Sequence, residues 1–220
     1  MSLTRWWRDS PRGCRWWLIG CGVTTFLVLG SVGWFFGRIA LAGRRAEALI
    51  QQQGPGLWAQ QHYPFWRGGP LVLGVPDTPR SAQVLRDASR RLDEFASRAE
   101  PGGLKSTEGS RFWCVPLRLV NYGDTRRLSR EYFILTLQEE DGSPAVVTET
   151  PAQDVLTLVE GSRFPYREML RDATRVLQAD QDSEWLLVFS APAKYPLRVQ
   201  SISRLDCRVG PYGFTLLRRE

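Results

Sequence analysis

Few residues of this sequence can carry out catalysis. His62 is the single histidine, so one chain cannot build a metal site from several imidazoles, and a Ser–His–Asp triad would have to use His62. The chain also lacks the G-x-S-x-G, H-E-x-x-H, G-x-G-x-x-G and P-loop patterns. We therefore interpret His62 as an ordinary linker residue, and we expect a protein that is not an enzyme and uses no metal or cofactor.

Three consecutive acids, Glu139, Glu140 and Asp141, are a second place where chemistry can be sought. Calcium binding or general acid–base catalysis would require their carboxylates to converge. Neighbouring side chains at a strand end diverge instead, and the following Gly142-Ser143 is typical of a tight turn. We interpret the segment as a solvated hairpin turn. The alternative is an envelope-facing hydrolase whose carboxylates come from distant strands.

The four cysteines fall into two pairs. Cys14 and Cys21 lie near the start of a long apolar segment, whereas Cys114 and Cys207 lie in strand-like surroundings. If the second pair is outside the cytoplasm it can form a disulfide, closing a loop of about 90 residues and adding about 4 kcal/mol. Otherwise both are buried thiols. The absence of a C-x-x-C motif argues against a redox enzyme.

The segment from Trp16 to Gly37 carries no charge and is bounded by Arg15 and Arg38. As a helix its 22 residues would extend about 33 Å, enough to cross a hydrocarbon core of about 30 Å. We therefore predict a transmembrane helix at residues 16–37. Aromatic side chains that favour the membrane interface stand at its two ends: Trp16, Trp17, Trp34, Phe35 and Phe36. Gly33 and Gly37 form a G-x-x-x-G pair that either lets two helices pack closely or only fills space.

The formal charge of +6 belongs mainly to the flanks of this helix. Residues 1–52 hold seven arginines against two acids, whereas residues 53–220 hold 22 basic and 21 acidic residues. The near-neutral remainder excludes the basic surface that a nucleic-acid-binding domain needs. With only two lysines, the arginine-rich composition is typical of a GC-rich, bacterial genome.

Orientation follows from the position of the span and its flanking charges. Positive-inside bias and the N-terminal location are typical of an uncleaved signal anchor. We predict an inner-membrane protein with its N-terminus in the cytoplasm and its C-terminal domain in the periplasm or outside. The alternative is a lipobox at Leu18-Ile19-Gly20-Cys21 with Cys21 lipidated, but the apolar run before Cys21 is shorter than such signals use.

We divide the chain into four parts: a basic cytoplasmic N-terminus (1–15), the span (16–37), a juxtamembrane helix with an aromatic linker (38–69) and an extracytoplasmic domain (70–220). Gly54-Pro55-Gly56 is expected to end the juxtamembrane helix. The linker contains an aromatic cluster that either presents a partner site or packs across the domain core: Trp58, Tyr63, Phe65 and Trp66. We favour packing.

The domain pattern begins with a short strand at 71–75, followed by a helix over residues 79–99, whose N-cap is Thr78. Its arginines at 86, 90, 91 and 98 are offset by three acids, which indicates a solvated face. Strands follow at 112–120 and 132–137, then a hairpin to 145–148 and an apolar run at 155–159. We expect a second helix over 166–179 and closing strands at 185–190, 197–202 and 214–217.

Three runs resemble a class of bacterial membrane-anchored, extracytoplasmic immunoglobulin-like β-sandwich domains: V-P-L-R-L-V-N-Y-G-D (115–124), Y-F-I-L-T-L-Q-E-E-D-G-S (132–143) and W-L-L-V-F-S-A-P (185–192). The resemblance implies a β-sandwich with added helices, no shared catalytic residues and a role in binding a protein partner or envelope component. The alternative fold is α+β, with helices on one face of an antiparallel sheet. An accessory subunit of a membrane complex is a further alternative.

Overall fold

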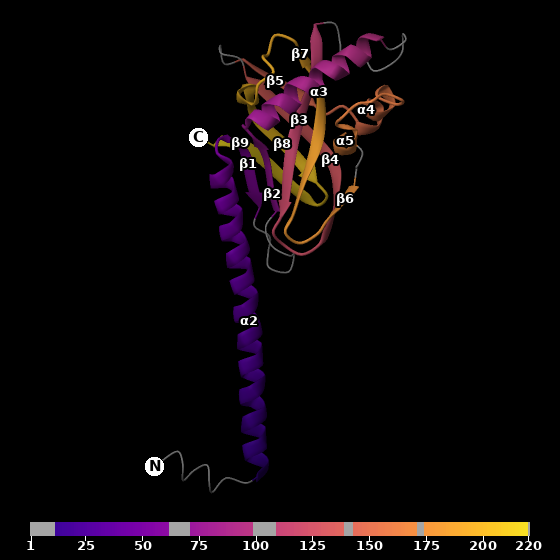
Figure 1. Cartoon of the computed structure of the whole chain (residues 1–220). Helices are drawn as coiled ribbons and strands as arrows, with labels where there is room; N and C mark the ends of the chain where they lie inside the picture. The colour runs from indigo at the N-terminus through magenta and orange to yellow at the C-terminus, as the bar shows by residue number, and fades with distance from the viewer. Residues whose placement is uncertain (1–11, 62–70, 99–108, 139–142, 171–173, 220) are drawn as a thin grey trace. The chain divides into compact units, whose positions relative to one another are not determined.

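A computed structural model describes residues 12–61, 71–98, 109–138, 143–170 and 174–219 (Figure 1). The chain divides into two compact units, Met1–Leu41 and Ala42–Glu220. The first consists of most of one long helix, and the second is a β-rich domain.

Helix α2 (Arg12–Gln53) is continuous through the predicted span and the predicted juxtamembrane helix. Its Gly20–Gln52 part is long and apolar enough to cross a membrane. The hydroxyls of Thr24, Thr25 and Ser31 donate to carbonyl oxygens three or four residues earlier in the helix, at 2.7–2.9 Å. These polar side chains are thus satisfied without water, as a hydrocarbon environment requires. The helix ends at Gly54, whose φ of 70° lies in the left-handed region that glycine favours.

The last turns of α2 belong to the domain. Ala46 and Ile50 are buried against Trp58, Val72 and Val120 on the outer face of the sheet. This hydrophobic cluster fixes the helix end that enters the domain.

In the part of the chain that the structure describes, nine strands and three α-helices follow α2. The strands are β1 (Gly56–Gln61), β2 (Leu71–Pro76), β3 (Ser110–Asn121), β4 (Arg126–Gln138), β5 (Pro144–Thr148), β6 (Thr174–Leu177), β7 (Gln181–Pro192), β8 (Ile202–Val209) and β9 (Tyr212–Arg219). The helices are α3 (Pro79–Arg98), α4 (Ala152–Leu158) and α5 (Arg167–Leu170), with a 3₁₀ turn, η2, at Val199–Ser201.

The strands form one antiparallel sheet in the order β5-β4-β8-β9-β1-β2-β3-β7, with β6 paired to the start of β4. The sheet curls until its two ends approach each other. Glu149, just after β5, forms an isolated bridge with Phe189 of β7, and the Thr150 N–H donates to the Val188 carbonyl at 2.7 Å. The domain is therefore nearly a barrel, and an immunoglobulin-like sandwich is not confirmed.

The barrel interior is filled by alternate residues of its strands. On β3, Trp113, Val115 and Leu117 point inward, whereas Phe112 and Cys114 lie in a separate cluster beneath the helices. This is the period-two alternation that the sequence predicted. Helices therefore cover the outside of β3 and β7, and α3 crosses β3 in Figure 1.

Helix α3 begins where predicted, because the Thr78 hydroxyl accepts the Ser81 N–H at 3.2 Å as an N-cap. Side chains of α3 also form hydrogen bonds with the part of β3 that β2 does not reach. The Ser89 hydroxyl accepts the Cys114 N–H and the Asp93 carboxylate accepts the Phe112 N–H, both at 2.9 Å. Two side chains one helical turn apart thus satisfy two alternate N–H groups of a strand.

The apolar run at 155–159 belongs largely to helix α4 (Ala152–Leu158), and Val155 and Val159 are buried one turn apart. Two predicted elements are wrong. The closing strand predicted at 197–202 is mostly irregular, because residues 199–201 form η2 and β8 begins only at Ile202. The helix predicted over 166–179 is only the four-residue α5 followed by strand β6. Pairing with the first residues of β4 draws 174–177 into the sheet, because tertiary hydrogen bonds outweigh a modest helical pattern.

Candidate functional site

An open groove of about 830 Å³ lies between α3 and the chain segment before η2. Helix α3 forms one wall, Arg111 of β3 contributes from the sheet, and Leu197 and Arg198 form the opposite wall. The wall of α3 consists of half-buried Asp93 and of exposed residues at about one-turn spacing: Arg86, Arg90, Glu94 and Ser97. We call this hollow the α3 groove.

Burial of the opposite side of α3 presents these residues to solvent. Leu85, Ala88, Leu92 and Ala96 are buried against the sheet, which leaves the arginines on the outer side. The hydrogen bonds from Ser89 and Asp93 to β3 fix the rotation of the helix. The packing of α3 against β3 therefore sets which of its residues face the groove.

The charge of the α3 groove is unbalanced, with four arginines against two acids. Arg111 is held by the carbonyl of Tyr195, and exposed Arg90 forms an ion pair with Asp87 at 3.2 Å. Within the described part of the chain, the side chains of Arg86 and Arg198 have no ion-pair or hydrogen-bond partner. These two guanidinium groups are available to an anionic ligand.

The two acids of the α3 groove differ. Burial raises the pKa of Asp93, and the Phe112 N–H and Arg111 counteract this rise only in part. Glu94 is exposed. Consecutive helical side chains diverge by about 100°, and the Asp93 carboxylate is already bound to a backbone N–H. The pair therefore lacks the convergent geometry that acid–base hydrolysis requires.

A second polar cluster lies where the two ends of the sheet meet, a region that we call the barrel seam. Arg130 of β4 forms an ion pair with Glu149, and their side chains are only 6% and 12% exposed. The Arg130 guanidinium lies 5.7 Å from the ring centre of Phe133 and 5.6 Å from that of Trp185. Burial lowers the pKa of Arg130 to about 10, so the group remains charged at neutral pH.

The position of Arg130 depends on a β-bulge. The register of β4 against β8 shifts between Arg130 and Tyr132. Regular alternation would place Arg130 and Phe133 on opposite faces of the strand, but because of this shift both contact the barrel interior. Bulges commonly re-aim side chains in this way. A pocket of about 400 Å³ lies beside the pair, between β4 and α4.

Side chains take the place of a strand along the free edge of β7. Arg175 of β6 donates to the Glu184 carbonyl at 3.0 Å, and Arg130 donates to the Leu186 carbonyl at 3.3 Å. With the bond to Val188 described above, three alternate carbonyls of the edge are satisfied. Arginine side chains thus complete the barrel and shield an edge that would otherwise invite another strand.

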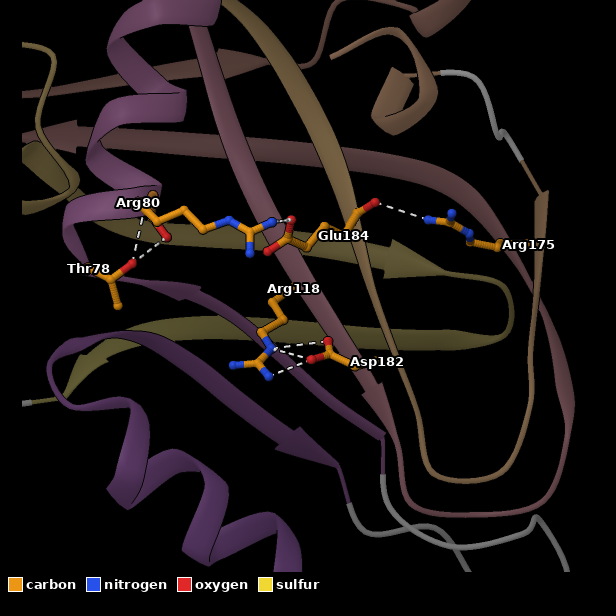
Figure 2. Close-up of polar contacts among 7 residues, drawn as sticks. Thr78, Arg80, Arg118, Arg175, Asp182 and Glu184 are labelled. Carbon is orange, nitrogen blue, oxygen red and sulfur yellow. Dashed lines mark hydrogen bonds and ion pairs between the residues drawn. The ribbon is translucent and has the colours of Figure 1, made fainter. Parts of the chain in front are cut away.

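Figure 2 shows the ion pairs that flank this edge. Arg80 of α3 reaches Glu184 at 2.9 Å, and the Arg118 guanidinium contacts both carboxylate oxygens of Asp182, with Nε at 3.0 Å from each. Each of these two acids is matched by an arginine, and the two ion pairs tether α3 and β3 to β7. Within the described residues, no group of three or more metal-ligating side chains is present.

Of the predicted aromatic cluster, the structure describes Trp58. It is 2% exposed and packs with the end of α2 against Val72 and Val120. Tyr63, Phe65, Trp66, His62 and the acids at 139–141 lie outside the described residues.

The structure describes some of the residues predicted at the ends of the span. Trp34, Phe35 and Phe36 lie on α2, and the side chains of Trp16 and Trp17 are not described. A Cβ built at Gly33 or Gly37 meets no atom within 4 Å, so this face of the helix has room for another helix.

The possible disulfide is not formed. Cys114 and Cys207 are both free and buried, and they belong to different hydrophobic clusters on strands that are not neighbours. Burial raises the pKa of both thiols, that of Cys207 to about 12. The alternative interpretation, two buried apolar thiols, describes them.

Sequence reasoning missed the α3 groove. It interpreted the arginines of α3 as a solvated face balanced by acids. That interpretation counted the charges but did not consider toward which side of the helix each side chain points. The four-residue spacing of Arg86 and Arg90 was a usable signal. Arg111 and Arg198 could not be assigned to the same site, because only the fold brings them together.

No protein-family model, curated protein or solved structure matches this chain.

Proposed function

We propose that this chain is a single-span protein of the bacterial inner membrane that holds a binding domain outside the cytoplasm, and that the α3 groove binds a protein partner or envelope component. The single observation that carries the proposal is the α3 groove itself, about 830 Å³ in volume and lined by four arginines. Two of these have no partner within the described residues. Arginine is favoured at binding surfaces because it offers planar, bidentate recognition and apolar contact together.

The apolar helix supports the membrane part of the proposal. Its window has the length and composition of a span and is unburied. Arg15 and Arg38 border the uncharged segment, where guanidinium groups interact with lipid headgroups. Orientation is tested by a single exposed thiol at Thr215→Cys, in a variant without other cysteines. A membrane-impermeant maleimide should label it in cells with a permeabilised outer membrane, and labelling only after inner-membrane lysis would contradict an outward domain.

Site-specific crosslinking tests the binding surface. A photoreactive amino acid at Ser97, an exposed residue of the α3 groove, should give a crosslinked adduct in living cells. The charge reversal Arg86→Glu should abolish that adduct. The matched reversal Arg208→Glu, on an exposed arginine of β8, should leave it intact. An adduct that survives Arg86→Glu, or no adduct at all, would contradict the proposed binding surface.

A further inference from the structure

We propose that the α3 groove binds an extended acidic peptide segment of a partner protein, with two acidic residues two positions apart and a basic residue two positions beyond them. This inference rests on the proposed function, because it names the partner chemistry of the same groove. It is carried by the order of charges along the exposed wall of α3, which runs Arg86, Arg90, Glu94.

The spacing of these charges matches an extended chain. Residues four apart on a helix are separated by about 6 Å along its axis. Alternate side chains of an extended chain lie on one face about 6.8 Å apart. Over two such steps the mismatch is about 1.6 Å, which long arginine side chains can absorb.

The buried side of α3 already pairs with an extended chain in this manner. Ser89 and Asp93, four residues apart, accept the N–H groups of Cys114 and Phe112, two residues apart. The geometry is therefore realised within this molecule, with hydrogen bonds of 2.9 Å at both positions. The exposed wall repeats the same four-residue period with charged groups.

The electrostatics favour carboxylates over a single bound anion. Arg86 and Arg198 lack partners within the described residues and come from opposite walls, and Arg90 is 68% exposed in its pair with Asp87. Guanidinium groups distributed along a groove suit a row of carboxylates, whereas one phosphate needs donors that converge. Leu197 and the arginine stems add apolar surface for a polypeptide.

Glu94 sets the third position of the proposed motif. It is an exposed carboxylate one turn beyond Arg90, so it repels a third acid and attracts a basic residue. The motif is therefore acid-x-acid-x-base. A peptide can present this motif from its N-terminus to its C-terminus or in reverse, because the side chains of α3 fix only the order of the charges.

Two peptides of identical composition test this order. Full-length protein in nanodiscs of phosphatidylcholine is titrated into fluorescein-labelled peptides containing Glu-Ala-Glu-Ala-Lys or Glu-Ala-Lys-Ala-Glu, and fluorescence anisotropy is measured at low salt. The second peptide has the wrong order in both directions. We expect the first to bind about three- to tenfold more tightly, the size of one or two exposed ion pairs. Arg86→Glu and Arg198→Glu should each remove a similar factor, and Arg208→Glu should not.

A charge reversal at Glu94 tests whether this residue selects the third charged side chain of the peptide. In Glu94→Arg the preferred peptide should become Glu-Ala-Glu-Ala-Glu. If that variant retains the preference for a final lysine, the proposed register is wrong.

Other outcomes separate the peptide inference from the proposed function. Equal affinity for both peptides, lost in Arg86→Glu, would overturn the ordered motif but leave the groove as a binding surface. Arg86-dependent flotation with phosphatidylglycerol vesicles, without peptide preference, would identify a lipid surface and overturn the peptide inference. If neither peptide binds but the Arg86-dependent Ser97 adduct persists, the peptide inference is overturned and the proposed function stands. Absence of the adduct as well would overturn the proposed function.

Discussion

The buried pair of Arg130 and Glu149 gives the sharpest prediction about stability. Arg130→Met keeps much of the side-chain volume but leaves Glu149, 12% exposed, without its cation. It also removes the donor to the Leu186 carbonyl on the edge of β7. Removing one partner of a buried ion pair costs about 3–5 kcal/mol of unfolding free energy. For a domain of this size that corresponds to a fall in Tm of about 6–20 °C.

A double-mutant cycle distinguishes the pair from simple packing. Arg130→Met combined with Glu149→Leu removes both charges, and such replacements are often neutral or stabilising. We therefore expect the double variant to be more stable than Arg130→Met alone. Unfolding by urea is followed by tryptophan fluorescence on the full chain in detergent micelles, since Trp113 and Trp185 are fully buried.

An exposed pair provides the matched control. Arg204 and Asp206 form an ion pair on β8 with the arginine side chain 52% exposed, so Arg204→Met should leave the urea midpoint nearly unchanged. If Arg130→Met is as mild as this control, or if the effects of the two seam substitutions simply add, the reasoning about the barrel seam is refuted.

Three further predictions concern the core and the helix that covers it. Burial raises the pKa of Asp93 above 3.8, so its ionisation disfavours the folded state, and stability is lost as pH rises from about 3.8 through the raised value. Asp93→Asn should therefore raise Tm at pH 7, with the difference shrinking below pH 4; a constant difference in thermal melts would contradict this. Cys114 and Cys207 should react with a neutral maleimide at pH 8 only after unfolding, as followed by mass spectrometry, and rapid labelling of the native protein would disprove their burial. Gly74→Ala should cost about 2 kcal/mol or more in urea unfolding, because the new methyl group would overlap the ring of buried Trp58, and a midpoint equal to wild type would contradict that packing.

Local chemistry made several elements predictable. The start of α3 was predicted from Thr78 and Pro79, since an N-cap and a proline at the first helical position act through neighbouring residues only. The turn after β3 has its own local signal, because Asn121-Tyr122-Gly123-Asp124 is typical turn chemistry, and the Asn121 side chain accepts the Gly123 N–H there at 3.2 Å. Both signals depend on contacts within four residues.

Predictions failed where distant segments decide the structure. Residues 174–177 have a helical pattern but pair with β4, and the strand predicted at 197–202 gives way to η2 before β8 begins at Ile202. The alternation on β3 identified which residues point inward, but it did not indicate whether the sheet curls or stacks. That difference depends on which strand meets β7, a contact between residues 149 and 189.

The candidate site shows the same division. Arg86, Arg90 and Glu94 are visible in the sequence as one face of a helix, whereas the approach of Arg111 and Arg198 depends on the packing of α3 beside β3 and η2. The burial of Arg130 likewise depends on a bulge in β4 and on the closure of the sheet.

The sequence by itself determined the long apolar helix, the position of α3 and the inward faces of the central strands, because periodicity and capping act over a few residues. The tertiary structure alone decided the nearly closed barrel, the free thiols, the buried ion pair at the seam and the α3 groove. Each of these depends on hydrogen bonds or desolvation between residues far apart in the chain, and their energies exist only once the fold has brought those residues together.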